Sequence, residues 1–426
     1  MTLLQIASLL IVLAAAFGTI NYLFLKLPSA IGILIVALFA SMAVMGLDWL
    51  APSLGVATAV RAEVTAFEFS DALLEGMLGL LLFAGALHVK LSDLKREWIL
   101  VFLMATIGVA LSTAVIGIGF SWLTGMPLLI ALVFGALISP TDPVAVLGVL
   151  RQANLRKSLE TKIAGESLFN DGVGYVVFLI LVGLAFPSEG AQGAAHGGEH
   201  AGEGSQIQAA AMLFIQEALG GAMLGIVLGW LTFRVMRRID DHSLEVLLTL
   251  ALAMGGYTLA VWLYVSAPIM AVCAGLLIGE VGTKYGMSAT TRRYVDGFWQ
   301  LIDEILIAVL FLMIGFEVFA VAFSWDYLTI GAASIALALL GRLSAVLVPV
   351  ALRNPFRGFS AGIVPIMTWG GLKGGISVAL ALSLPDSEWK PMILTVTYII
   401  VLFSIIVQGL TVAPLARRVG REPELG

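Results

Sequence analysis

Residues 139–143 read Ser-Pro-Thr-Asp-Pro and interrupt an apolar run that extends from Pro127 to Leu150. Two prolines three residues apart cannot lie in an intact helix, because each lacks a backbone N–H and obstructs the preceding turn. The carbonyl groups that they release are costly in hydrocarbon unless they line a polar cavity. Carbonyls, hydroxyls and the Asp142 carboxylate are hard oxygen ligands that suit a small cation. The stretch therefore predicts a broken membrane helix at a cation site, and Asp142 is equally suited to cap the half-helix that follows.

The composition of the whole chain places it in a membrane. Of its 426 residues, 60% are apolar and 12% are charged, whereas about 25% of the residues of a soluble protein are charged. The apolar runs are continuous rather than alternating, which excludes a β-barrel and leaves an all-α polytopic membrane protein. The single cysteine, Cys273, cannot form an internal disulfide, and no basic block indicates nucleic-acid binding.

We expect about thirteen transmembrane helices, each of which needs about 20 mostly apolar residues. Their expected bounds are Leu3–Phe24, Ser29–Leu50, Ser70–Val89, Trp98–Leu123, Pro127–Leu150, Glu160–Phe186, Ile207–Val235, Leu244–Val265, Pro268–Val281, Gly297–Val321, Tyr327–Leu352, Gly362–Leu384 and Pro391–Ala416. The ninth segment is short for a full crossing.

The basic residues orient these helices. Nineteen of the 23 lysines and arginines lie in the loops after odd-numbered segments, at the helix ends that adjoin those loops, or in the C-terminal tail, and only Arg61 and Lys390 lie in the other loops. A miscounted helix would reverse this bias partway along the chain. The positive-inside rule therefore predicts an external N-terminus and a cytoplasmic C-terminus.

The odd number of helices has a consequence for internal symmetry. Segments one and eight start on opposite sides of the membrane, so two related halves would be inverted repeats, as in secondary transporters. The stretch Gly370-Gly371-Leu372-Lys373-Gly374 makes segment twelve a poor helix, and it is fifth in its half, as segment five is. We expect these two unwound helices to cross at a mid-membrane site.

Segment six carries a polar face. At 100° per residue, Glu166 and Asn170 share one stripe of the helix, and Ser167 and Asp171 share the next. Carboxylates inside a membrane are costly and by default indicate function. A hydrogen bond between helices would account for any one of these residues, but the four together favour an ion site. Arg342, in the middle of segment eleven, needs a partner, and Glu166 and Asp171 are the candidates.

These motifs together resemble a known family. Thr-Asp-Pro-Val-Ala-Val begins at Thr141, Gly-Glu-Ser-Leu-Phe-Asn-Asp-Gly begins at Gly165, and Gly-Gly-Leu-Lys-Gly begins at Gly370. Combined, they are similar to the NhaP/NHE branch of the sodium–proton antiporters. The resemblance extends over nearly the whole chain in the number and order of segments.

The resemblance implies an NhaA/NhaP-like fold with two domains. Core-domain helices would occupy residues 96–187 and 326–418, and dimerisation-domain helices would occupy residues 1–95 and 241–325. A flexible external loop (188–206) and a linking helix (207–240) would join the halves, and residues 419–426 would form a cytoplasmic tail. The core would move like an elevator against the second domain, which would form a homodimer among membrane lipids.

The resemblance also assigns roles to site residues. Asp171 matches the aspartate that binds either the cation or the proton, and Asn170 matches its partner. Thr141, Asp142 and Ser167 match positions around the ion, which would bind to Asp171, Asp142, Thr141 and Ser167. Glu166 and Arg342 match a structural ion pair. Gly370, Gly371, Lys373 and Gly374 belong to the unwound helix, where the family usually has arginine in place of Lys373; a lysine can lose its proton when desolvated, whereas an arginine does not.

The expected function is therefore exchange of Na⁺ or Li⁺ for H⁺ across a bacterial or archaeal plasma membrane. Two adjacent aspartates mark the electrogenic branch of the family, and Asn170 replaces the first of them here, which suggests one-for-one, electroneutral exchange. A K⁺/H⁺ antiporter with the same site is the alternative. A cation channel would show a pore-lining repeat or a carbonyl filter, which the sequence lacks. An enzyme is not expected, since no histidine lies in the expected membrane core, and no cofactor is needed.

Overall fold

The computed structural model describes residues 3–51, 55–66, 69–142, 157–186, 203–321, 324–353 and 362–419. These residues are entirely helical, with no strand among them. Every expected segment contains helix, and ten helical stretches of the described chain are long and apolar enough to cross a membrane. The all-α membrane architecture is thus confirmed, while the number of thirteen crossings stays a prediction.

The helices of the first half end before the loop that is expected to be external. They are α1 (Leu3–Ile20), α2 (Ser29–Leu50), α3 (Val56–Ala66), α4 (Phe69–Asp71), α5 (Leu78–His88), α6 (Leu91–Leu103), α7 (Val109–Thr124), α8 (Leu128–Ile138) and α10 (Lys157–Ala185). Short π-helical turns continue or join some of them into longer stretches, namely η1 (Asn21–Leu25), η3 (Ala72–Met77) and η4 (Met104–Gly108).

The second half of the described chain also consists of helices connected by short turns. Its helices are α11 (Glu203–Met236), α12 (His242–Trp262), α13 (Ala267–Leu277), α14 (Thr283–Tyr285), α15 (Ala289–Phe316), α16 (Trp325–Arg353), α17 (Ile363–Trp369), α18 (Gly375–Leu382), α19 (Lys390–Phe403) and α20 (Gly409–Val419). The π-helical turns η6 (Ile278–Gly282) and η8 (Ser404–Gln408) join α13 to α14 and α19 to α20, and a 3₁₀ turn, η7 (Glu317–Phe319), ends α15.

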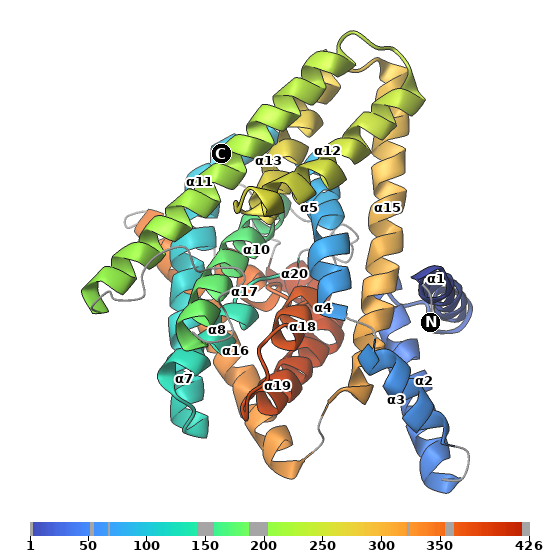
Figure 1. The fold of residues 1–426 in the computed structure, drawn as a ribbon, viewed down its shortest axis with the longest axis vertical. Helices are drawn as coiled ribbons and strands as arrows, with labels where there is room; N and C mark the ends of the chain where they lie inside the picture. The colour runs from blue at the N-terminus through green and yellow to red at the C-terminus, as the bar shows by residue number, and fades with distance from the viewer. Residues whose placement is uncertain are drawn as a thin grey trace.

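The helices form two groups on either side of α15. Figure 1 shows α1, α2 and α3 at the right, beside α15, and α7, α8, α10 and α16 at the left. Within the left group α8 packs on α7 and α10, and α16 packs on α7 and α19. The two broken helices, α8 with the residues after it and α17–α18, therefore lie inside one group.

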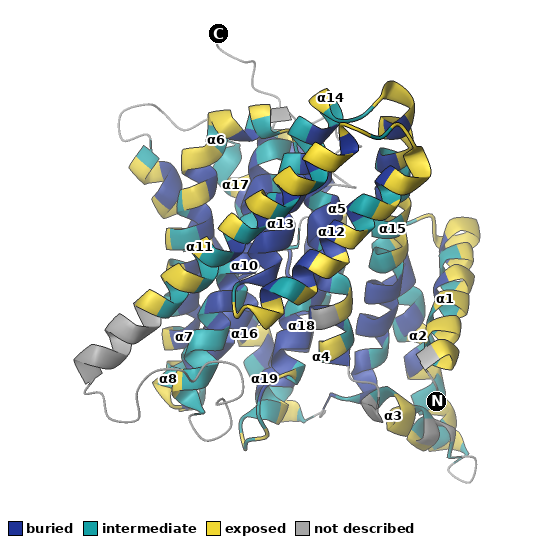
Figure 2. Ribbon diagram, turned by 45° about the horizontal axis from the view of Figure 1, so that its top comes forward, coloured by how far each residue is buried: buried dark blue, intermediate teal, exposed yellow. Residues whose placement is uncertain are grey.

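Burial agrees with a membrane environment. In Figure 2 buried residues concentrate on α5, α10, α13 and α18, whereas α1 and α11 are largely exposed. Many of the exposed side chains of these outer helices are large and apolar, for example Val12 and Met223. Apolar side chains on the outside and polar ones inside are expected when the solvent is lipid.

Three elements differ from the sequence-based expectation. α3 is a short helix in a stretch expected to be an external loop. The ninth segment is longer than expected, because helix continues past Val281 through Lys284 to Tyr285. α11 begins at Glu203 rather than at Ile207, since Glu203, Gln206 and the alanines that follow are favourable helix formers. Residues 187–202 of the expected external loop, and the tail beyond Val419, lie outside the described residues.

Candidate functional site

The first broken helix ends at Ile138, and its released backbone groups find partners on the second one. The ammonium of Lys373 donates to the carbonyls of Ser139 (3.0 Å) and Pro140 (3.3 Å). The backbone N–H of Asp142 donates to the carbonyl of Leu372 (2.8 Å). The two breaks are therefore joined directly, as expected for crossing unwound helices. Pro143 and the half-helix that Asp142 was expected to cap lie outside the described residues.

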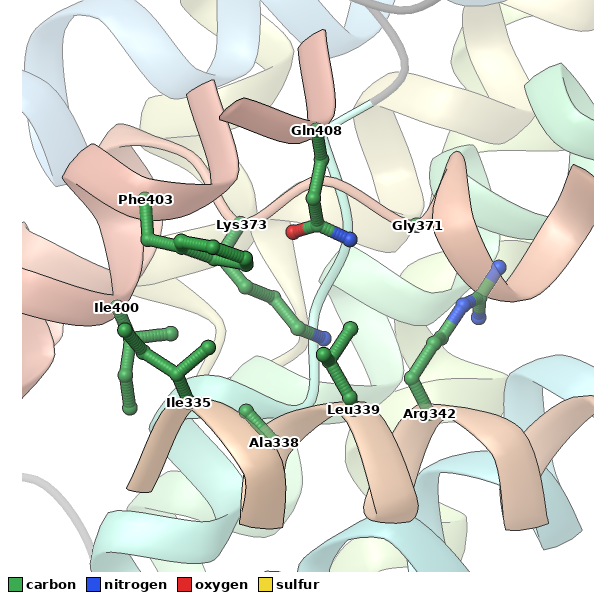
Figure 3. Close-up of a pocket in the computed structure, with 9 residues that line it drawn as sticks. All are labelled: Ile335, Ala338, Leu339, Arg342, Gly371, Lys373, Ile400, Phe403 and Gln408. Atoms are coloured by element: carbon green, nitrogen blue, oxygen red, sulfur yellow. The ribbon is translucent and has the colours of Figure 1, made fainter. Parts of the chain in front are cut away.

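The second break covers residues 370–374, between α17 and α18. Two side chains of η8 hold it in place. Ser404 accepts a hydrogen bond from the N–H of Lys373 (2.8 Å), and the amide of Gln408 donates to the carbonyl of Trp369 (3.0 Å), the last residue of α17. Figure 3 shows the Lys373 ammonium pointing between Gln408 and α16, with the Arg342 guanidinium to one side. A small cavity, about 10 Å³, separates these groups.

The polar face of α10 lies against the first break. The Asn170 side-chain amide donates to the Thr141 hydroxyl (2.8 Å), and its oxygen accepts from the N–H of Thr141 (3.4 Å). The Thr141 hydroxyl is also 3.0 Å from that of Ser167. An aspartate at position 170 could not donate the first of these bonds when ionised. Asn170 thus fixes Thr141 through two hydrogen bonds, next to the Ser167 hydroxyl.

Asp171 lies at the centre of this cluster. It is 5% exposed, and its Oδ1 atom has no hydrogen-bond partner among the described residues. Its carboxylate interacts electrostatically with three charged side chains, those of Asp142, Lys373 and Glu166. A buried carboxylate oxygen without a partner is costly, and a proton or a cation would satisfy it.

Asp142 completes the cluster from the first break. Its side chain is half-buried, and it approaches the second break so closely that a Cβ atom on Gly374 would lie 2.6 Å from the Asp142 Cβ. Gly374 therefore allows the close crossing of the two unwound helices.

Glu166 and Arg342 form an ion pair next to the cluster. Both guanidinium NH₂ groups bond the carboxylate, one of them at 2.8 Å, and the Arg342 Nε donates to the carbonyl of Met367 (3.1 Å). Of the two partners that the sequence allowed for Arg342, the structure selects Glu166. The pair connects α10 and α16 and places Arg342 beside α17.

Within the described residues, the structure thus places Thr141, Asp142, Ser167, Asn170, Asp171 and the second break in one region, with the Glu166–Arg342 pair beside them. The sequence analysis missed Ser404 and Gln408, although two polar residues spaced i, i+4 in an apolar segment were the signal. No cluster of three or more His, Cys, Asp and Glu side chains that could hold a metal ion occurs in the described part of the chain.

Comparison with known proteins gives a consistent result. The family described as "Sodium/hydrogen exchanger, transmembrane" matches residues 10–418. The chain is 46% identical to the Na⁺/H⁺ antiporter NhaP of Pseudomonas aeruginosa, over 98% of this chain and 97% of that protein. It is 34% identical to the Na⁺/H⁺ antiporter NhaH of Halobacillus dabanensis, over 93% of each chain. The fold is similar to that of the sodium proton antiporter MjNhaP1 from Methanocaldococcus jannaschii, with a TM-score of 0.72 at 19% identity, over 98% of this chain and 99% of that one.

Proposed function

The chain belongs to the sodium/hydrogen exchanger family, and we propose that it is a secondary antiporter that exchanges Na⁺ for H⁺ across the membrane. The observation that carries this proposal is the buried Asp171 carboxylate with its unpartnered Oδ1, next to the hydroxyls of Thr141 and Ser167. Such a carboxylate holds either a proton or a small cation, one at a time. Competition for one group is what exchange at a single site requires.

The Na⁺ ligands in this proposal are oxygen atoms of Asp171, Asp142, Thr141 and Ser167. Asn170 does not bind the ion but holds Thr141, because its amide donates to the hydroxyl and leaves a lone pair for a cation. Li⁺ is a smaller hard cation with the same ligand preference, so we include it as a substrate. No cofactor takes part in the exchange.

The charges of the site support one-for-one exchange. Asp142, Glu166 and Asp171 supply three carboxylates, and Arg342 and Lys373 supply two cations. One negative charge is left over when all five groups are ionised. One Na⁺ or one H⁺ neutralises it, so both loaded forms have the same charge and exchange is electroneutral.

We propose an elevator movement for the site. The elements that carry it, α8, α10, α16, η8 and the α17–α18 break, are tied to one another by the ion pair and hydrogen bonds described above. They form one of the two helix groups and so would move as a body against α1, α2 and α15. Exposed apolar residues on α1 and α11 suit contact with lipid and with a second copy of the chain in a homodimer.

The protein is an integral membrane protein, and its proposed place is a bacterial or archaeal plasma membrane. The basic loops support an external N-terminus and a cytoplasmic C-terminus. Lys95 and Arg96 on α6, and Arg353 at the end of α16, would face the cytoplasm.

The test is transport by the purified protein in liposomes that contain a pH-sensitive dye, with inward gradients of Na⁺, Li⁺ and K⁺ in turn. We expect Na⁺ and Li⁺ to drive proton efflux and Asp171→Asn to abolish it, because a neutral amide neither titrates nor binds a cation well. Asp326→Asn, an exposed carboxylate at the start of α16, is the matched control and should exchange like wild type. Wild-type rates in Asp171→Asn would overturn the proposal, and a response to K⁺ alone would favour a K⁺/H⁺ antiporter.

A further inference from the structure

A second charged cluster lies on α6, α10 and α16, at the ends that are expected to face the cytoplasm. The Glu97 carboxylate of α6 is 3.3 Å from the Lys162 ammonium of α10 and 3.0 Å from the guanidinium of Arg353 on α16. Arg353 also donates to the carbonyl of Arg96 (3.3 Å). One carboxylate thus bridges cations on two other helices. None of these residues belongs to the ion site.

The three helices meet because small residues let them approach. Leu94 and Val101 lie on the same face of α6 as Glu97, one turn to either side. A Cβ atom on Gly165 of α10 would lie 2.8 Å from the Leu94 side chain and 3.3 Å from that of Val101. The α6 face therefore lies directly on α10, between Lys162 and Glu166. Farther along the same stretch, a Cβ on Gly108 would lie 2.9 Å from the carbonyl of Ala345 on α16.

The cluster and the ion site share two helices. Lys162 precedes Glu166 by four residues on α10, and Arg353 follows Arg342 by eleven residues on α16, so each pair lies on one helix face. α10 and α16 are therefore joined twice. Glu166 and Arg342 join them directly beside the ion site, and Glu97 joins them through a bridge three turns of α16 away.

We propose that Glu97 is a positioning residue for the ion site, an inference that rests on the proposed exchange function. By binding both Lys162 and Arg353, it fixes the first turns of α10 against α6 and α16. This holds Ser167 and Asn170 within hydrogen-bond reach of Thr141. Ser167 lies little more than one turn after Lys162 on α10, and Asn170 lies about one turn beyond Ser167. Without the bridge, α10 would keep only the Glu166–Arg342 tie to α16 and could rotate about it.

The single Glu97 carboxylate faces two cations, Lys162 and Arg353, which differ in their exposure to solvent. The Lys162 side chain is 10% exposed and that of Arg353 is 30% exposed. Arg353 reaches solvent, whereas Lys162 is nearly buried, and among the described residues its counter-charge is Glu97. A neutral side chain at position 97 would leave a nearly buried cation, which is strongly unfavourable, so α10 would shift to hydrate it.

The experiment compares the apparent KM for Na⁺ with the maximal rate of exchange in liposomes. Residues that support the ligands of a bound metal ion typically change its affinity by about 10–100-fold. We expect Glu97→Gln and Lys162→Met each to raise the KM for Na⁺ about tenfold, with little change in maximal rate. Glu97→Asp, which retains the carboxylate, should restore most of the affinity. Glu160→Gln, which changes a carboxylate at the same end of α10 outside the Glu97–Lys162–Arg353 bridge, is the matched control and should keep the wild-type KM.

Each outcome decides the inference. A lower melting temperature of Glu97→Gln with an unchanged KM would overturn it, because the bridge would then only stabilise the fold. So would an equal rise in KM for Glu160→Gln. If Glu97→Gln does not fold, the double variant with Lys162→Met has no nearly buried cation left without Glu97, because Arg353 reaches solvent, and it should still show the raised KM. Failure of the proposed function is distinct, since the wild type itself would then not exchange Na⁺ for H⁺.

Discussion

The two broken helices occupy matching positions in the two halves of the chain, but they contribute opposite chemistry. The first break supplies oxygen atoms from Thr141 and Asp142 and lies against the carboxylates of α10. The second supplies the Lys373 ammonium and glycines, and Ser404 and Gln408 brace it. In the proposed site, the first half of the chain therefore provides the cation ligands. The second half provides the Lys373 counter-charge and the residues of η8 that hold the second break in place.

The strongest test of this division removes the cation that joins α10 to α17, the helix that leads into the second break. Arg342 bonds Glu166 on the ligand side and the carbonyl of Met367 on the side of the second break. Removing one partner of a buried ion pair can cost about 3–5 kcal/mol, so Arg342→Ala should lower the melting temperature far more than Asp171→Asn does. Equal melting temperatures of the two variants in the same detergent would show that the Glu166–Arg342 pair does not hold the second break in place.

Lys373 tests whether the second break supports the first. Lys373→Met leaves the carbonyls of Ser139 and Pro140 without their donor, which costs about 1–3 kcal/mol. If that cost falls on the exchange-competent state, we expect exchange to slow about ten- to hundredfold. Lys373→Arg keeps a cationic donor and should remain within a few-fold of wild type. The measurement is the sodium-driven dye signal of each variant in liposomes. Equal exchange rates of the methionine and arginine variants would contradict the division of roles between the two breaks.

The brace on the second break has a smaller expected effect. Gln408→Met is nearly isosteric but removes the hydrogen bond to the Trp369 carbonyl, a loss of about 1 kcal/mol. A modest fall in melting temperature should result. Gln300→Met, at an exposed position of α15, provides the comparison, and an equally small change in both would mean that the amide is not a brace.

The smallest expected effect is that of membrane voltage on the rate of exchange. If Asp171 is the only group that exchanges its proton, the site has the same charge in both directions of movement. Each elementary charge moved across 100 mV would be worth about 2.3 kcal/mol, so net charge movement would be easy to detect. We expect sodium-driven proton flux to be the same with and without a potassium–valinomycin potential. A large change in rate would show that a second group titrates, and Lys373 is the first to examine.

Sequence reasoning located the helices because hydrocarbon requires long apolar segments, and these are visible without a structure. It did not find the helical continuation beyond Val281 through Lys284 to Tyr285, since a charged residue at a helix end looks like part of a loop. α3 was missed for a related reason: its residues, among them Arg61 and Glu63, are too polar for a membrane segment and too few to show a clear period.

The same limit applies to the candidate site. Charged residues in apolar segments, such as Asp171 and Arg342, are conspicuous because each is costly there. Ser404 and Gln408 are not, because an uncharged polar residue in a membrane helix is common. The pairing of Glu97 with Lys162 could not be anticipated either, since both lie where charged residues normally meet water, and only the approach of α6 to Gly165 brings them together.

The hydrogen bond from the Asp142 N–H to the Leu372 carbonyl has a consequence for biogenesis. The first break enters the bilayer during synthesis, but its acceptor and the Lys373 ammonium lie in segment twelve and are made only after six further apolar segments have followed it. Until then its free N–H and carbonyl groups must be hydrated or shielded, because lipid satisfies neither. We therefore expect nascent chains that stop before segment twelve to be substrates for membrane chaperones and proteases, and the assembly of the site to be a late, post-insertion event.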